Sequence, residues 1–222
     1  MSKSKQNYPD PHLVLNTYGA DALRAYLIDS PVVRAEPLKF SEAGLKEIVR
    51  TVVLPYWNAL SFFTTYAAVD DFDPRSWIPR TEGDRRPIDR WVLSVLQSLV
   101  REVNAEMEGY RLYNVVPRLV SFIDQLTNTY IRLSRARFWK SSDHLDQADA
   151  YHTLYTVLAT FAKVLAPFMP FLTEEVHQRL VRPVEPTAPA SIHWCDYPTA
   201  DTALIDLDLE RDVAVAMTVA GL

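Results

Sequence analysis

Apolar side chains recur at every third or fourth position over most of the chain, which is the spacing of one face of an α-helix. Glycine is scarce, with five residues in all, and few turns typical of β-hairpins are present. We therefore expect a mainly all-α protein. The expected helices cover residues 12–18, 21–29, 41–68, 88–108, 111–140 and 148–166, a shorter stretch that ends near residue 181, and residues 203–220.

Several of these helices have recognisable start and stop residues. Asp10 and Ser41 are good N-caps, because their side-chain oxygens can accept hydrogen bonds from the unpaired amides of a first helical turn. Gly109 is a typical residue at which a helix ends. Pro55 is expected to kink the helix 41–68, since proline lacks the amide hydrogen that a helix interior needs.

Two regions do not follow the helical period. Val32–Val33 and Leu38–Phe40 each allow a short strand, and residues 182–202, which are rich in proline, predict an irregular connection. The long helix 111–140 instead has a regular apolar stripe, which predicts its buried face. That stripe consists of Val115, Leu119, Phe122, Leu126, Tyr130 and Leu133.

Composition limits the class of protein. Hydrophobic residues make up 48% of the chain and charged residues 23%, as in an ordinary soluble globular protein. No apolar run approaches the roughly 20 residues of a membrane helix. The single cysteine, Cys195, fits a reducing cytosol, and the five histidines lack the spacing of a metal site. We expect a cytoplasmic monomer with no membrane segment and no metal. The net charge of −5 means that any RNA contact must come from a local basic patch.

One such patch lies near the end of the helix 111–140. At about 100° per residue, Arg132, Arg135 and Trp139 fall together on the face opposite the apolar stripe, and Lys140 continues the basic run. An exposed tryptophan between arginines suits stacking on a nucleobase, with the guanidinium groups on phosphates. Arg137 falls on the core side, where we expect a buried ion pair. The alternative is a solvated basic helix end that complements its own dipole.

The first residues of the chain have a second candidate chemistry. Ser2, Lys3 and Ser4 alternate hydroxyl and ammonium groups, and Pro9 and Pro11 follow in a turn-forming sequence. Ammonium groups neutralise a polyphosphate and hydroxyl groups donate hydrogen bonds to it. The alternative is a loose, lysine-bearing N-terminus, since chain ends are usually loose.

These phrases resemble a known family. Met1–Ser4 resembles the last four residues of the Lys-Met-Ser-Lys-Ser signature of class I aminoacyl-tRNA synthetases, and residues 5–11 resemble the segment that follows in the isoleucyl, valyl and leucyl branch. Residues 30–40 and 130–139 are similar to phrases of isoleucyl-tRNA synthetases, and 167–175 to a phrase shared across the branch. The first lysine of the signature is absent, so we expect this chain to be a C-terminal part of a longer synthetase.

The resemblance implies three parts. Residues 1–40 would be the end of the signature loop and the stem-contact fold, residues 41–182 an α-helical anticodon-binding bundle, and residues 183–222 an irregular connection and the start of a further helix. The nucleotide-binding domain, with its His-x-Gly-His signature, and the editing domain would lie upstream. The family activates isoleucine with ATP and transfers it to tRNA, and we expect this chain alone to be inactive.

The resemblance also implies roles for particular residues. Lys3, with Ser2 and Ser4, would stabilise the pyrophosphate charge of ATP, with magnesium, in the full-length enzyme, and no cofactor is expected on this chain alone. The partner would be tRNA(Ile). In the related methionyl branch, an asparagine and a tryptophan of the bundle read anticodon bases, which suggests Trp57 and Asn58, although core packing of Trp57 is the alternative. The candidate tRNA-binding residues are therefore Arg132, Arg135, Trp139, Lys140, Trp57 and Asn58.

Two other interpretations remain open. The chain could belong to a valyl- or leucyl-tRNA synthetase, or it could be a stand-alone helical module that binds tRNA or protein without catalysis. The phrases at 30–34 and 135–139 favour the isoleucyl branch over its siblings.

Overall fold

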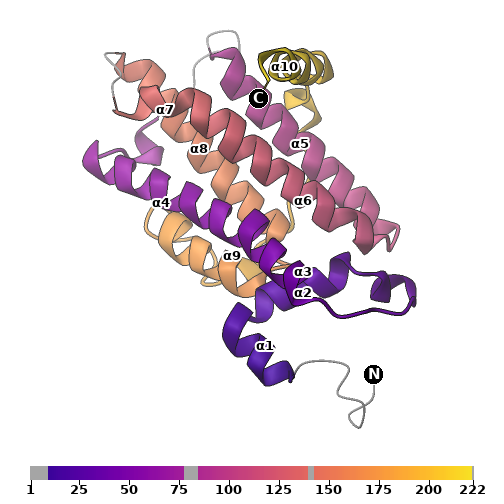
Figure 1. Ribbon diagram of the computed structural model, residues 1–222. Helices are drawn as coiled ribbons and strands as arrows, with labels where there is room; N and C mark the ends of the chain where they lie inside the picture. Colours follow the sequence, from indigo (N-terminus) through magenta and orange to yellow (C-terminus); the bar gives the residue numbers. More distant parts are fainter. Residues whose placement is uncertain (1–9, 78–84, 140–142, 222) are drawn as a thin grey trace.

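The computed structural model describes residues 10–77, 85–139 and 143–221 of the chain, and the fold is all-α (Figure 1). No strand occurs within these ranges. The α-helices are α1 Pro11–Tyr18, α2 Ala20–Asp29, α3 Glu42–Ile48, α4 Leu54–Val69, α5 Pro87–Glu108, α6 Val115–Asp124, α7 Arg132–Trp139, α8 His144–Leu165, α9 Pro170–Val176 and α10 Leu207–Ala220.

Short π-helical segments join some of these helices end to end. Val49–Val53 connects α3 to α4, Gln125–Ile131 connects α6 to α7, and His177–Val181 extends α9. The helices α4, α5, α6–α7 and α8 pack side by side as a bundle around one hydrophobic core, and α10 lies against α5 (Figure 1). The first π-helical segment ends two residues before Pro55, the residue at which the sequence predicted a kink.

The α1–α2 pair is attached where α8 gives way to α9. The carboxylate of Asp21, on α2, accepts hydrogen bonds from the backbone amides of Phe171 (3.3 Å) and Leu172 (2.7 Å) in the first turn of α9. Arg24 Nε donates to the carbonyl of Pro167 (3.0 Å). A carboxylate at a helix N-terminus satisfies otherwise unpaired amides. These contacts fix the N-terminal helices against the bundle.

Two sequence-based expectations for the connection after α2 are wrong. Val32 and Val33 do not form a strand but lie in a 3₁₀-helix, Pro31–Arg34, whose N-cap Ser30 accepts a hydrogen bond from the Val32 amide. A serine cap followed by proline starts a helical turn as readily as a strand. Leu38–Phe40 is irregular, because no described segment pairs with it, and Phe40 instead packs edge-on against Tyr26.

The buried stripe of the helix 111–140 changes register at its π-helical segment. Leu126 and Tyr130 are buried as predicted, but Leu133 is 51% exposed, so its assignment to the core was wrong. A π-helical turn inserts a residue into the α-helical repeat and rotates the face that follows. The buried face therefore continues from Tyr130 through Ser134 and Phe138.

The helix predicted at 148–166 begins earlier than expected. It starts at His144, because the side chain of Asp143 accepts hydrogen bonds from the amides of Leu145 (3.0 Å) and Asp146 (3.1 Å). None of the described helices combines the length and the hydrophobicity that a membrane span requires.

Large aromatic side chains fill the centre of the bundle. Tyr56 on α4 is fully buried, and its ring meets Phe161 of α8 edge-on with 5.1 Å between centroids. The Tyr56 hydroxyl donates a hydrogen bond of 2.8 Å to the carbonyl of Leu158. Burial raises the pKa of Tyr56 far above its usual value, so the hydroxyl remains a donor. This contact ties α4 to α8.

We predict that Tyr56→Phe lowers the free energy of unfolding by about 1 kcal/mol, because a buried hydrogen bond is lost without a change in ring packing. Urea denaturation followed by circular dichroism measures this difference. The matched control is Tyr110→Phe, since the Tyr110 side chain is 91% exposed. Equal unfolding midpoints for the two variants would contradict the role of the Tyr56 hydroxyl.

A second aromatic cluster covers the start of α8. The Trp77 ring stacks on His152 with 3.7 Å between centroids, and Trp77 Nε1 donates to Asp149 Oδ1 (3.0 Å). The Arg85 guanidinium lies 4.9 Å from the Trp77 ring centroid. Burial, helped by the positive charge of Arg85, lowers the pKa of His152 to about 4, while Asp149 opposes the shift. The imidazole is therefore neutral in the fold at pH 7.

This histidine makes the stability depend on pH. Between about pH 6.5 and 4 the unfolded chain binds a proton at residue 152 that the folded chain does not, so acidification favours unfolding. We expect wild type to lose roughly 1–2 kcal/mol of stability in this window relative to His152→Phe, which keeps the stacking. Urea denaturation at pH 7 and pH 4.5 tests this. The exposed His12, replaced by Phe, serves as the control, and parallel pH profiles for all three proteins would refute the assignment.

Candidate nucleic-acid interface

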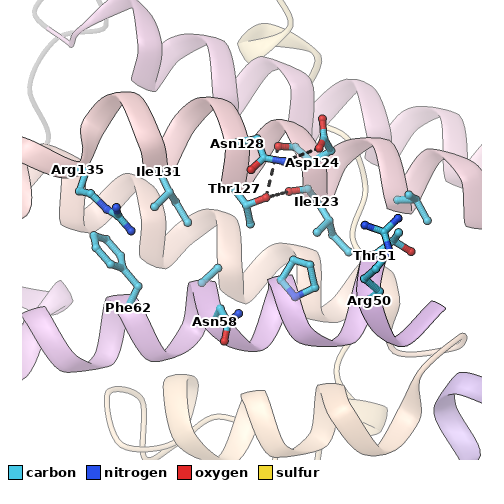
Figure 2. Close-up of a pocket in the computed structure, with 13 residues that line it drawn as sticks. Arg50, Thr51, Asn58, Phe62, Ile123, Asp124, Thr127, Asn128, Ile131 and Arg135 are labelled. Carbon is cyan, nitrogen blue, oxygen red and sulfur yellow. Dashed lines mark hydrogen bonds between the residues drawn. The ribbon is translucent and has the colours of Figure 1, made fainter. Parts of the chain in front are cut away.

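A polar groove runs between α4 and the continuous helix made of α6, Gln125–Ile131 and α7 (Figure 2). It encloses about 460 Å³, which is room for a nucleotide rather than for a metal ion. Its lining combines hydrogen-bonding side chains with two arginines and some apolar surface. The lining residues are Arg50, Thr51, Pro55, Asn58, Ala59, Phe62, Val120, Ile123, Asp124, Thr127, Asn128, Ile131 and Arg135.

The two walls of the groove present polar groups at helical spacing. Asn58 and Phe62 are one turn apart on α4, and Figure 2 shows Phe62 facing Arg135 across the groove. On the opposite wall, Asn128 Nδ2 donates to Asp124 Oδ1 (2.6 Å), which fixes the orientation of the amide. The Asn58 amide has no hydrogen-bond partner in the described part of the chain, so it is available to a ligand.

Trp139 stands at the end of this wall. Its side chain is 45% exposed, and its ring packs edge-on against Tyr66 of α4 with 5.6 Å between centroids. The Arg135 guanidinium lies 5.3 Å from the centroid of the Trp139 ring. The ring is therefore held by neighbours and still open to solvent, which is the arrangement that base stacking needs.

Arg132 and Arg135 are both exposed, in agreement with the helical wheel, but they open onto different cavities. Arg135 lines the groove beside α4, whereas Arg132 lines a second cavity of about 430 Å³ between α5, α10 and the π-helical segment. Neither arginine has an acidic partner among the residues described in the structure. Asp124 lines both cavities and Glu210 the second, without an ion pair to either arginine.

Arg137 is buried, and the ion pair expected on the core side is confirmed. Its Nη1 and Nη2 donate to the two carboxylate oxygens of Asp89 on α5, at 2.8 and 2.7 Å. Its Nε and Nη2 donate to the carboxylate of Asp146 on α8, at 3.1 and 2.8 Å. Burial alone lowers the pKa of Arg137, but the hydrogen bonds and charge of Asp89 outweigh it, so the pKa lies above its usual value.

The neighbouring residues Trp57 and Asn58 point to different places. Asn58 lies in the groove, whereas Trp57 is half-buried against the core, with the Arg179 guanidinium 5.2 Å from its ring centroid. This position agrees with packing as the role of Trp57. The remaining candidates, Ser2, Lys3, Ser4 and Lys140, lie outside the described residues.

The sequence interpretation missed the groove residues Arg50, Thr51, Thr127 and Asn128. A usable signal existed, because Thr51 and Asn58 are seven residues apart on one helix and Asp124, Asn128 and Arg135 share a face of the other. Across the described residues, no group of three or more His, Cys, Asp or Glu side chains is placed to hold a metal ion.

Comparisons with known proteins identify the class. The family model described as the anticodon-binding domain of tRNA ligase matches residues 89–221, and the model for class I tRNA synthetases (I, L, M and V) matches residues 1–39. The chain belongs to the anticodon-binding domain family of class I tRNA ligases. Within this class, the chain is similar to isoleucine–tRNA ligases, as the segments at residues 30–40 and 130–139 predicted.

Three of these relatives show the extent of the similarity. The isoleucine–tRNA ligase of Bdellovibrio bacteriovorus is 46% identical over 224 residues, and those of Chlamydia abortus and Chlamydia pneumoniae are 45% and 46% identical over 222 residues. Each alignment covers 100% of this chain and 21% of the relative. The chain thus spans about a fifth of the length of these relatives.

Two solved structures share the fold. The Agrobacterium radiobacter K84 LeuRS, in a ternary complex with tRNA and LeuAMS, superposes with a TM-score of 0.64 at 21% identity over 93% of this chain and 23% of that one. The methionyl-tRNA synthetase of Mycobacterium tuberculosis, bound by methionyl-adenylate, gives a TM-score of 0.58 at 20% identity over 83% of this chain and 38% of that one. At these identities the likeness supports the fold alone.

Proposed function

We propose that this chain is the tRNA-binding part of an isoleucine–tRNA ligase, which activates isoleucine with ATP and attaches it to tRNA(Ile) in translation. The observation that carries the proposal is the groove beside α4, which Arg135 lines, with the exposed Trp139 one helical turn beyond Arg135. The choice of isoleucine and tRNA(Ile) rests on the isoleucine–tRNA ligase relatives, since their similarity extends over the whole chain.

The groove matches the chemistry of a single-stranded anticodon loop. A nucleobase can stack on the Trp139 ring, and the guanidinium of Arg135 can contact a phosphate. The amides of Asn58 and Asn128 offer donors and acceptors to base edges. Arg132 extends the positive surface to the other side of the same helix. Trp57 has a packing role in this proposal.

The proposal for the rest of the enzyme is supported by the similarity to these relatives. Lys3, with Ser2 and Ser4, would contact ATP-magnesium together with a catalytic domain, where its charge stabilises the leaving pyrophosphate. We assign residues 1–40 to the signature loop and stem-contact fold, 41–182 to the bundle and 183–222 to the connection and a further helix. The whole protein is proposed to act as a cytoplasmic monomer, with catalytic and editing domains on the same chain.

We predict that Trp139→Ala weakens binding of a tRNA(Ile) transcript by roughly 1–3 kcal/mol, because a stacked base loses its platform.

Arg135→Ala should reduce the slope of log affinity against log salt by about one phosphate contact. Fluorescence anisotropy with labelled tRNA over a range of salt concentrations measures both effects. Transcripts of tRNA(Val) and tRNA(Leu) should bind more weakly than tRNA(Ile).

Matched controls exist elsewhere on the surface. Trp194 is 74% exposed, and Arg179 lies over Trp57 as Arg135 lies over Trp139. Trp194→Ala and Arg179→Ala should leave tRNA binding within about twofold of wild type, as expected for surface substitutions outside a binding site. If Trp139→Ala and Arg135→Ala also bind like wild type, the basic end of α7 only complements its helix dipole. A preference for tRNA(Val) or tRNA(Leu) would favour a sibling ligase.

The 222-residue chain by itself should not catalyse isoleucine-dependent exchange between ATP and pyrophosphate, since only the end of the ATP signature is encoded in it. The assay needs protein from a host whose own ligase carries a removable tag, so that contamination is excluded. Exchange above the level of a Lys3→Ala variant would contradict the proposal that catalysis requires a separate catalytic domain.

A further inference from the structure

The most buried charged cluster of the described residues lies on the core side of α7, the helix that carries the candidate RNA-binding residues Arg135 and Trp139. The Arg137 side chain is 7% exposed and that of Asp89 0%. Tyr130 adds a hydrogen bond from its hydroxyl to Asp89 Oδ1 (2.9 Å), and Arg86 Nε lies 2.8 Å from Asp146 Oδ1. Asp89 and Asp146 thus each bond the Arg137 guanidinium and one further side chain, and none of these residues lines the groove.

The cluster joins helix ends of opposite polarity. Arg137 lies in the last turn of α7, whereas Asp89 is the third residue of α5 and Asp146 the third residue of α8. Carboxylates are favoured at helix N-termini and cations at helix C-termini. The end of α7 is thereby fixed to the beginnings of two other helices by charge-assisted, bidentate hydrogen bonds.

Stability alone does not require such a cluster. A buried ion pair is often no more stabilising than apolar side chains of similar volume, because both charges lose their hydration. It does impose one geometry, since a planar guanidinium must meet both carboxylates at once. An apolar substitute would leave α7 packed through Phe138, whose ring meets Phe62 and Tyr151 edge-on, but would not impose the same single orientation.

α7 is the last part of the long helix that lines the groove. It follows a π-helical segment that rotates its buried face, and Leu133 on its outer face makes no core contact. Arg135 and Trp139 lie two residues to either side of Arg137, about 200° around the helix, and so point outward when Arg137 points inward. Their directions depend on how Arg137 is held.

We propose that Arg137, clamped by Asp89 and Asp146, is a positioning residue for RNA binding that orients Trp139 and Arg135 at the end of the groove. This inference rests on the proposed function. Lysine at position 137 would keep the charge but has a single ammonium group, which cannot replace the fork between two carboxylates. Arg137→Lys should therefore loosen α7 while the bundle stays folded.

The first test reads the tryptophan directly, without RNA. In the 222-residue chain labelled with 5-fluorotryptophan, the ¹⁹F resonance of Trp139 is identified by its loss in Trp139→Phe. Arg137→Lys and Asp89→Asn should shift or broaden this resonance and leave those of Trp57 and Trp194 in place. The control Arg179→Lys should change Trp57 only. If the Trp139 resonance is unchanged in both cluster variants, and their circular dichroism spectra match that of the wild type, the inference is overturned.

The second test asks whether the effect on RNA passes through Trp139. We expect Arg137→Lys to weaken binding of a tRNA(Ile) transcript about fivefold when Trp139 is present, and less than about twofold in the Trp139→Ala background. A residue that only stabilises the fold would cost the same in both backgrounds. If Arg137→Lys weakens binding equally in both backgrounds while Trp139→Ala itself weakens binding, the positioning role of Arg137 is overturned and the proposed function stands. If Trp139→Ala has no effect, the proposed function at this site fails and the positioning role falls with it.

Discussion

The guanidinium of Arg137, held between the carboxylates of Asp89 and Asp146, sets the arrangement of the bundle at the end that carries the exposed tryptophan. Three helices meet there, and each contributes a charge at the terminus where its backbone dipole favours that charge. Because the cluster is buried and fully hydrogen-bonded, it allows few alternative packings. The groove beside α4 and the direction of Trp139 both follow from the position of α7 that it defines.

The proposed function depends on a contrast between the net charge of the whole chain and the charge of this local surface. The chain carries a net charge of −5, so its overall field does not attract RNA. The outer face of the helix that ends in α7 offers two arginines without acidic partners in the described residues, together with a tryptophan that remains 45% exposed. We propose that this site binds a flexible loop whose bases can leave the stack, which is how proteins read single-stranded RNA.

The amino-acid sequence predicted most of the helices because their caps and apolar periods are local properties, as at Asp10, Ser41 and Gly109. It also placed Arg137 inside and Trp139 outside. It failed at Leu133, since the π-helical turn that rotates this residue outward comes from packing across the bundle rather than from local preference. The sequence nominated Asn58 and Arg135 separately but did not predict that they line one groove, because they lie far apart in the chain and only the packing of the bundle brings them together. The role of Lys3 came from the family resemblance alone.

The RNA-binding role of the groove is tested most directly by mapping the nucleotides that it contacts. The photoreactive residue p-benzoylphenylalanine, placed at Phe62 in the groove, should crosslink tRNA(Ile) at nucleotides of the anticodon loop after irradiation. The same residue placed at Phe171, which is 70% exposed on α9, should give little crosslinking. Sequencing of the crosslinked RNA identifies the nucleotides. Crosslinks from position 62 to the acceptor stem, or stronger crosslinking from position 171, would contradict the claim that this groove binds the anticodon loop.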